Sequence, residues 1–190
     1  MRKLTVFNLM TLDGYIAGPG GDISWHHVDE EFQEMAIKAS NSGNTLIFGR
    51  VTYELMASYW PTAEALRTDP FVARGMNSAE KIVFSRTLDK AGWNNTRLVK
   101  YHMVDEIRKL KQQPGKDLTI LGSGSIVMQL AQEGLIDEYQ VLLNPVVLGK
   151  GKTMFDCLEG TLRLKLVGTR TFDDGNVLLT YVPEQGQGRT

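Results

Sequence analysis

The sequence is poor in cysteine, has no excess of one charge and contains no long apolar run. Cys157 is the only cysteine among the 190 residues, so an intrachain disulfide and a cysteine-rich zinc site are excluded. The 21 basic and 22 acidic residues give a net charge of -1, which argues against a nucleic acid or an anionic membrane as partner. No segment approaches the roughly 20 apolar residues that a membrane helix needs. We therefore expect a cytoplasmic protein, because a single cysteine suits a reducing compartment.

Motifs of metal and hydrolytic sites are also missing. His26 and His27 are adjacent, so they cannot bind one metal as two histidines at i and i+4 of a helix can, and His102 is the only other histidine. The chain contains no Gly-x-Ser-x-Gly turn, and Cys157 has no recognisable partner histidine. We therefore expect neither a metal site nor a hydrolase.

What the sequence does contain is short apolar runs that alternate with amphipathic segments. Strands are predicted at residues 4–10, 45–49, 81–85, 96–100, 117–121, 137–149, 162–172 and 176–182. Helices are predicted at residues 30–40, 50–60, 103–113 and 125–134. The stretch between residues 61 and 80 contains Pro61 and Pro70 and is expected to be an irregular surface loop.

This order of elements predicts the fold class. Alternating strands and helices indicate parallel strands covered by helices on both faces, and the turn at 173–175 indicates an antiparallel hairpin. We predict an α/β fold with a central, mostly parallel eight-stranded sheet, flanking helices and a C-terminal antiparallel hairpin. Residues 1–183 are expected to form a single domain, and the polar segment 184–190 a disordered tail. Two small domains split at 61–80 are a weaker alternative, because neither half would hold a complete sheet.

Four small residues join the strand at 117–121 to the helix that follows it. They are Gly122, Ser123, Gly124 and Ser125. A helix that begins at the carboxyl end of a parallel strand presents unpaired N–H groups, and small residues let a phosphate approach them. The segment therefore fits a binding site for a diphosphate. We also expect a left-handed backbone at Gly124, where a valine side chain would be strained. A tight turn with Ser125 as a plain helix cap explains the same residues.

Two other strand ends carry groups that bind anions. Gly49 and Arg50 lead into a helix that contains Thr52, while Ser85 and Arg86 follow the strand at 81–85. Three such joins together favour a ligand with several phosphates, such as a dinucleotide. Arginine accommodates a 2′-phosphate, so the two arginines favour NADPH over NADH. Taken singly, Arg50 fits a solvated helix-start arginine equally well.

The glycine-rich segment after the first strand is a candidate lid over the ligand. Asp13 either contacts a substrate or closes the turn with its neighbouring glycine, and Trp25 either faces the ligand or belongs to the core. Asp29 and Glu30 are the carboxylates predicted near this end of the sheet. Each also fits a helix cap or a solvated face.

These motifs, in this order, resemble the dihydrofolate reductase superfamily, and within it the branch related to the C-terminal reductase domain of the riboflavin-biosynthesis deaminase-reductase. The resemblance rests on "TLDGYIA", "IFGRVTYE", "KIVFSRTL", "GSGSIVMQLAQEGLIDEYQVLLNPVVLGKGKTMF" and the closing hairpin. It implies NADPH lying across the strand ends and hydride transfer to a pterin-like or pyrimidine ring.

The same resemblance assigns roles to individual residues. Ala17 would lie near the nicotinamide, and the segment from Trp25 to Glu30 would face the substrate, with Asp29 or Glu30 as the catalytic carboxylate. The diphosphate would lie on the residues from Gly122 to Ile126. The adenosine side of the cofactor would be held by Gly49, Arg50, Thr52, Ser85 and Arg86.

Two departures from the family pattern concern the substrate. Tyr15 stands where the riboflavin reductases often have lysine, and Leu121 where they often have glutamate. The substrate pocket is therefore expected to be repurposed, while the cofactor half is intact. A non-catalytic NADP(H)-binding module is the alternative function. A homodimer is expected from the apolar edge offered by the strand at 137–149 and the hairpin, and relatives resembling this chain commonly pair.

Overall fold

The computed structural model describes residues 1–156 and 158–184. The expectations for Cys157 and for nearly all of the tail at 184–190 therefore fall outside the described residues. None of the helices in the described part of the chain is long and apolar enough to cross a membrane.

An eight-stranded sheet forms the centre of the molecule, with strand order β5-β4-β3-β6-β1-β7-β10-β9. Its strands are β1 (Leu4–Thr11), β3 (Thr45–Gly49), β4 (Lys81–Phe84), β5 (Thr96–Val99), β6 (Leu118–Leu121), β7 (Glu138–Asn144), β9 (Leu164–Thr171) and β10 (Val177–Pro183). Neighbours from β5 to β7 run parallel, whereas β10 pairs antiparallel with both β7 and β9. The predicted mostly parallel sheet with a closing hairpin is confirmed.

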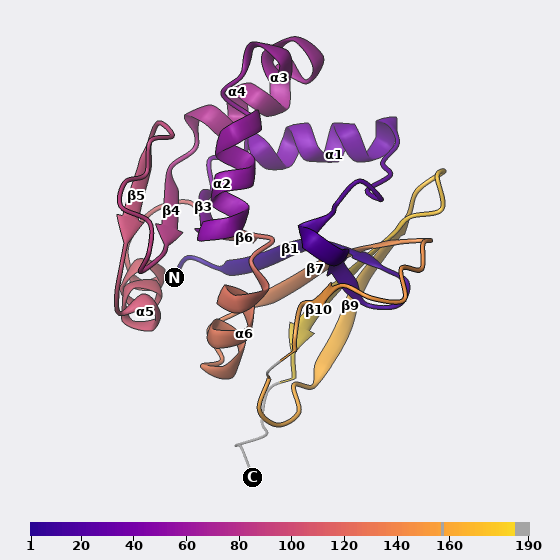
Figure 1. Cartoon of the computed structure of the whole chain (residues 1–190). Helices are drawn as coiled ribbons and strands as arrows, with labels where there is room; N and C mark the ends of the chain where they lie inside the picture. The colour runs from indigo at the N-terminus through magenta and orange to yellow at the C-terminus, as the bar shows by residue number, and fades with distance from the viewer. Residues whose placement is uncertain (157, 185–190) are drawn as a thin grey trace.

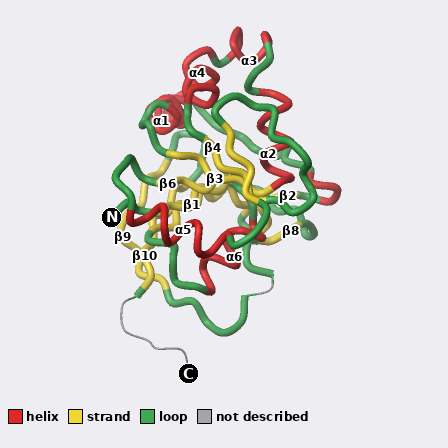
Figure 2. The backbone as a smooth tube through the Cα atoms, turned by 90° about the vertical axis from the view of Figure 1, so that its left-hand side faces the viewer, coloured by secondary structure: helices red, strands yellow, loops and turns green. Residues whose placement is uncertain are grey.

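Helices cover the parallel part of the sheet on both faces (Figures 1 and 2). One face carries α1 (Glu30–Ser40), α2 (Arg50–Tyr59) and α4 (Pro70–Ser78), and the other carries α5 (Met103–Gln112) and α6 (Gly124–Gln132). The two cores follow from the alternation of side chains along each strand. In β3, Leu46 and Phe48 pack on the α1, α2 and α4 side, while Ile47 packs on the α5 and α6 side.

The expectation of an irregular loop at residues 61–80 is wrong. This stretch forms α3 (Ala63–Thr68) and α4, and Pro70 occupies the first turn of α4, where its missing N–H costs no hydrogen bond. α4 buries Val72 and Met76 against the sheet. A Cβ added at Gly75 would lie 2.6 Å from the carbonyl oxygen of Ser40, so α4 lies directly against the end of α1.

The strand predicted at 137–149 is shorter than expected. β7 ends at Asn144 because Pro145, which follows it, has no N–H to donate to a ladder. After β7, β8 (Lys152–Thr153) pairs antiparallel with β2 (Tyr15–Ala17) in a separate two-stranded ribbon. A short 3₁₀ helix, η1 (Pro19–Gly21), follows β2. β7 lies between β1 and β10, so it provides no free edge, contrary to the reasoning behind the expected homodimer; β9 is the edge strand of the hairpin.

Candidate functional site

A cavity of about 1260 Å³ lies at the carboxyl ends of the parallel strands. Because β4, β3, β6 and β1 are consecutive in the sheet, the joins that follow β4, β3 and β6 open side by side. Every residue predicted to bind the cofactor lines this cavity, namely Ala17, Gly49, Arg50, Thr52, Ser85, Arg86, Gly122, Ser123, Gly124, Ser125 and Ile126. The structure thus brings together residues that are more than a hundred positions apart in the sequence.

Side-chain hydroxyl groups fix the β3–α2 join to the β6–α6 join. The Ser123 hydroxyl accepts a hydrogen bond from the Gly49 N–H at 2.7 Å and donates to Thr52 Oγ1 at 3.0 Å. Thr52 Oγ1 also accepts from the Ser123 N–H at 3.1 Å. In this position Ser123 has a left-handed backbone conformation, φ 59° and ψ 60°, which is uncommon and strained for a residue other than glycine.

The two helices that begin at these joins have no side-chain caps. Gly49 is the N-cap of α2 and Ser123 is the N-cap of α6, and neither N-cap residue makes a side-chain hydrogen bond to the first turn of its own helix. Ser123 does not cap its own helix, because its hydroxyl is committed to Gly49 and Thr52. Two sets of unpaired N–H groups and two positive dipole ends therefore meet at one wall of the cavity, which is an arrangement suited to binding phosphate.

Glycine is required in this wall at Gly122 rather than at Gly124. Gly122 has φ 61°, and an added Cβ would lie 3.0 Å from both Thr52 Cγ2 and Thr52 Oγ1. Gly124 opens α6 without a left-handed backbone, and its Cβ would meet Ile16 Cδ1 at 3.3 Å. The expectation of left-handed strain at Gly124 is therefore wrong, and the strain belongs to its neighbours Gly122 and Ser123.

The charges around the cavity favour an anionic ligand. Its cationic side chains are Arg50, Arg86, Lys100 and Lys152, whereas Asp69 is the only carboxylate among the described lining residues. Arg50 also pairs with Glu54 at 2.7 Å, but both side chains are about half exposed. Such a surface ion pair contributes little stability, so Arg50 can turn to a ligand at small cost.

The carboxylates predicted to act in catalysis do not line the cavity. One oxygen of Asp29 accepts the Phe32 N–H at 2.8 Å and so caps α1, and the other accepts the Asp174 N–H at 3.4 Å. Glu30 is exposed in the first turn of α1. The structure gives Asp29 the helix-cap role that the sequence left open beside the catalytic one.

The residues predicted to bind substrate also lie outside the cavity lining. Asp13 accepts hydrogen bonds from Thr11 Oγ1 at 2.6 Å and from the N–H groups of Leu148 and Gly149 at 3.1 and 2.7 Å. The bond from Thr11, followed by those from the backbone, holds the pKa of Asp13 below its usual value. Asp13 therefore fastens the turn before β2 to the loop before β8. Trp25 donates from its indole to the Asp22 carbonyl oxygen at 3.2 Å.

Two residues of the substrate segment, His26 and Val28, line the cavity without a role assigned from the sequence, and His26 is the polar one. Its Nε2 is buried and has no hydrogen-bond partner within the described residues. Burial lowers the pKa of His26, although the negative charge of Asp22 partly opposes this, so the site favours the neutral imidazole. The sequence placed the right segment at the cavity, but His26 was considered only as a metal ligand.

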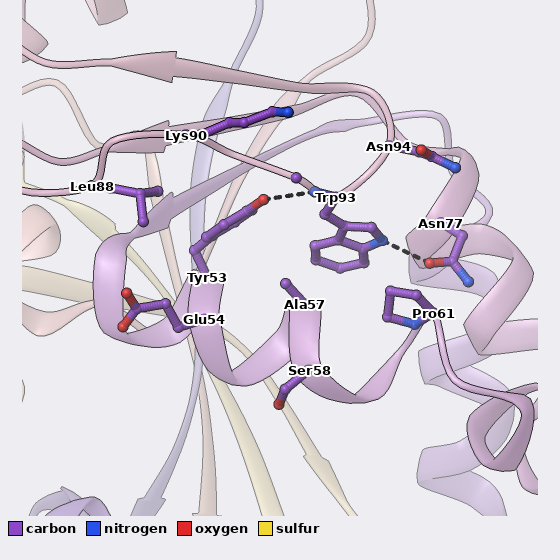
Figure 3. A pocket seen from close by; sticks show the side chains of 11 residues that line it. Tyr53, Glu54, Ala57, Ser58, Pro61, Asn77, Leu88, Lys90, Trp93 and Asn94 are labelled. Carbon is purple, nitrogen blue, oxygen red and sulfur yellow. Dashed lines mark hydrogen bonds between the residues drawn. The ribbon is translucent and has the colours of Figure 1, made fainter.

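A second, smaller cavity of about 680 Å³ lies on the far side of α2 (Figure 3). Its wall is held by Trp93, whose backbone N–H donates to the Tyr53 hydroxyl at 3.0 Å and whose indole donates to Asn77 Oδ1 at 2.7 Å. These bonds connect the segment before β5 to α2 and α4. The described residues that line this cavity include none of the predicted site residues.

Comparison with known proteins finds relatives that match nearly the whole length of this chain. The family model of the RibD C-terminal domain matches residues 2–178. The protein YyaP of Bacillus subtilis (strain 168) is 33% identical over 182 residues, which cover 95% of this chain and 94% of YyaP. A putative riboflavin biosynthesis protein from Shewanella sp. PV-4 has a TM-score of 0.73 at 26% identity, over 96% of this chain and 99% of that one. Dihydrofolate reductase from Enterococcus faecalis has a TM-score of 0.64 over 96% of this chain and 97% of that one; at 16% identity this likeness shows the fold alone.

Proposed function

Because the chain belongs to the RibD C-terminal domain family, within the dihydrofolate-reductase-like superfamily, we propose that it is an NADPH-dependent reductase that transfers hydride to a pterin-like or pyrimidine-type heterocycle. The observation that carries this proposal is the pair of uncapped helix N-termini, α2 and α6, locked together by Ser123 and Thr52 beside a cluster of cations. The Enterococcus faecalis structure of the same fold is a complex with NADP(H).

The residues present fit a dinucleotide. The N–H groups at the start of α6 and α2 would hold the diphosphate, and Gly122 keeps the wall free of a side chain there. Arg50 and Arg86 would bind the 2′-phosphate, and Ala17, on β2, would border the nicotinamide. At about 1260 Å³ the cavity exceeds the roughly 300–1,000 Å³ of a usual single-ligand pocket, so there is room for a second molecule beside the cofactor.

When bound, the cofactor supplies the hydride; the chain orients both molecules and excludes water. Asp29 and Glu30 stay the proposed source of the proton for a ring nitrogen. Since both oxygens of Asp29 accept backbone N–H groups, Asp29 would act through a water molecule that it holds.

A test of the proposal separates binding from turnover. NADPH binding is followed by quenching of tryptophan fluorescence, and turnover by loss of NADPH absorbance with dihydropterins and with aminopyrimidines that carry or lack a sugar phosphate. We expect saturable NADPH binding and cofactor oxidation with at least one heterocycle. Failure of NADPH to bind would contradict the proposal.

The alternative, a non-catalytic NADP(H)-binding module, is favoured by one observation. Asp69 is the only carboxylate of the described cavity lining, and it is already hydrogen-bonded to Gln33. This alternative predicts cofactor binding without oxidation of NADPH by any heterocycle of the panel.

A further inference from the structure

One part of the large cavity is lined mainly by apolar side chains. It lies between the sheet and the helices α1, α2 and α4, and we refer to it as the chamber. On the sheet side Thr5 and Phe7 of β1 form its floor. The apolar side chains that define it are Phe7, Phe32, Met35, Met56, Val72 and Met76. Phe32 of α1 stacks on Phe7, with ring centroids 6.3 Å apart, so the aromatic end of the chamber is built by contacts between α1 and the sheet.

The only charged side chain in the described lining of the chamber is a carboxylate. Asp69, between α3 and α4, accepts a hydrogen bond from the Gln33 side-chain amide and forms no ion pair with any described residue. The cations of the cavity lie elsewhere. Arg50, Arg86 and Lys100 follow β3, β4 and β5, and Lys152 is on the β8 ribbon. A phosphate in the chamber would therefore meet a carboxylate and no cation.

We propose that the second ligand of this site is an uncharged compound whose apolar portion fills the chamber, and that phosphorylated sugar derivatives are excluded from it. The statement that this ligand is the substrate rests on the proposed reductase function. The statement that the chamber takes an uncharged apolar group rests on its lining alone.

The physical reason is the balance between desolvation and pairing. An ionised group that leaves water for an apolar site is strongly disfavoured unless an opposite charge or several hydrogen bonds replace its hydration. An apolar ring gains from the same transfer in proportion to the area that it buries. The lining offers the ring aromatic and methionine side chains. To a phosphate it offers the Thr5 hydroxyl and the Gln33 amide, which already donates to Asp69, and no cation among the described residues.

Two fluorescent dyes with the same ring system test this proposal. N-phenyl-1-naphthylamine is neutral, and 8-anilinonaphthalene-1-sulfonate adds one sulfonate. Both dyes are titrated into the protein in the presence of saturating NADP⁺. NADP⁺ is not fluorescent, and it would occupy the part of the cavity that is lined by the arginine and lysine side chains. We expect the neutral dye to bind at least about tenfold more tightly. Equal or tighter binding of the sulfonate would overturn the proposal.

Variants in α1 locate the bound dye. Ala36 lines the chamber and is half-buried, so Ala36→Leu fills part of it, whereas Glu34 is exposed on the same helix and does not line the cavity. Ala36→Leu should raise the dissociation constant of the neutral dye about tenfold, and Glu34→Leu should change it by no more than about twofold. Should Ala36→Leu fail to fold, Ala39→Leu makes the test at an exposed lining position. Unchanged dye binding in the folded Ala36 and Ala39 variants would overturn the proposal.

The two proposals fail separately in this experiment. If NADP⁺ does not bind but Ala36→Leu still weakens binding of the neutral dye, the reductase proposal is wrong and the chamber assignment stands. If NADP⁺ binds and the chamber variants leave the dissociation constants of both dyes unchanged, the reductase proposal stands and the chamber assignment is wrong.

Discussion

Gly122 is the residue on which the proposed phosphate-binding wall of the cavity, formed by the N-termini of α2 and α6, depends most directly. We expect Gly122→Ala to weaken NADPH binding at least about tenfold, because its Cβ would lie 3.0 Å from Thr52 and displace the Thr52–Ser123 bonds. Gly134→Ala is the matched control: it has nearly the same φ, 63°, but nothing lies within 4 Å of its added Cβ. Both variants carry the cost of a left-handed alanine, so a loss of NADPH affinity in both alike would contradict the role of Thr52. Circular dichroism and nucleotide titration are the measurements.

Arg86 should decide between the two nicotinamide cofactors. A hydrogen bond to a charged group contributes about 1.5–3 kcal/mol, which corresponds to about 10- to 150-fold in affinity. We expect the wild-type chain to prefer NADPH over NADH within that range, and Arg86→Ala to lose most of the preference. Arg67→Ala, an exposed arginine of α3 outside the cavity lining, should leave the preference unchanged. Equal affinity of the wild-type chain for both cofactors would rule this role out.

At the scale of single residues, the sequence located the cavity lining at the strand ends better than the lining in the segment predicted to face the substrate. Gly49, Arg50 and Ser85 could be placed because each immediately follows an apolar strand, and parallel strand ends meet at one edge of the sheet. Asp29 could not be assigned, because a carboxylate before a helix satisfies the cap and the active site equally well in the sequence. His26 became visible only through the burial of its Nε2, which depends on the loop packing that three-dimensional structure defines.

Among the elements, α4 depends on a buried cation at its C-terminal end. The Lys81 ammonium donates to the carbonyl oxygens of Met76 at 2.8 Å, Asn77 at 3.2 Å and Ala79 at 2.7 Å, and it lies 4.5 Å from the centre of the Trp93 ring. Lys81→Met would leave these carbonyl groups without their donor. We expect it to lower the free energy of unfolding by about 1–3 kcal/mol in urea titrations, whereas the exposed Lys90→Met should change it by less than about 0.5 kcal/mol. A Lys81→Met variant as stable as the wild type would show that the carbonyl groups find other donors.

The same lysine predicts a dependence of stability on pH. Burial lowers the pKa of Lys81 to about 8 from its ordinary value of 10.5. Between these two values the unfolded chain holds a proton that the folded chain has lost, so this group makes the protein more stable as pH rises through that window. We therefore expect the stability difference between wild type and Lys81→Met to grow from pH 8 to pH 10.5 when urea titrations are repeated across it. A difference that stays constant with pH would mean that the ammonium keeps its ordinary pKa.

The elements that sequence reasoning misjudged share a physical cause. The helices at 63–78 were missed because Pro61 and Pro70 signal breaks, yet proline is favoured at the first turn of a helix, where Pro70 lies. The burial of Val72 and Met76 and the close approach of Gly75 to Ser40 of α1 show that this segment packs on the domain. The β2–β8 ribbon was missed because strands of two or three residues leave no periodic pattern. The central strands β3 and β4 were predictable because they are buried on both faces and form continuous apolar runs.

For the whole molecule, we predict a homodimer formed through the hairpin. β9 ends the sheet as an edge strand of eight residues, and its Leu166 and Val167 side chains are 47% and 53% exposed. An edge with exposed apolar side chains favours pairing with a second chain, whereas the opposite edge, β5, has only four residues.

Sedimentation at micromolar concentration should give a dimer for the wild-type chain and a monomer for a variant carrying Leu166→Lys and Val167→Lys. As a control, Leu66→Lys places a lysine at an exposed leucine of α3, away from the hairpin, and should leave the dimer intact. A wild-type chain that sediments as a monomer would contradict the prediction, and a dimer that survives both hairpin substitutions would place the interface on another surface.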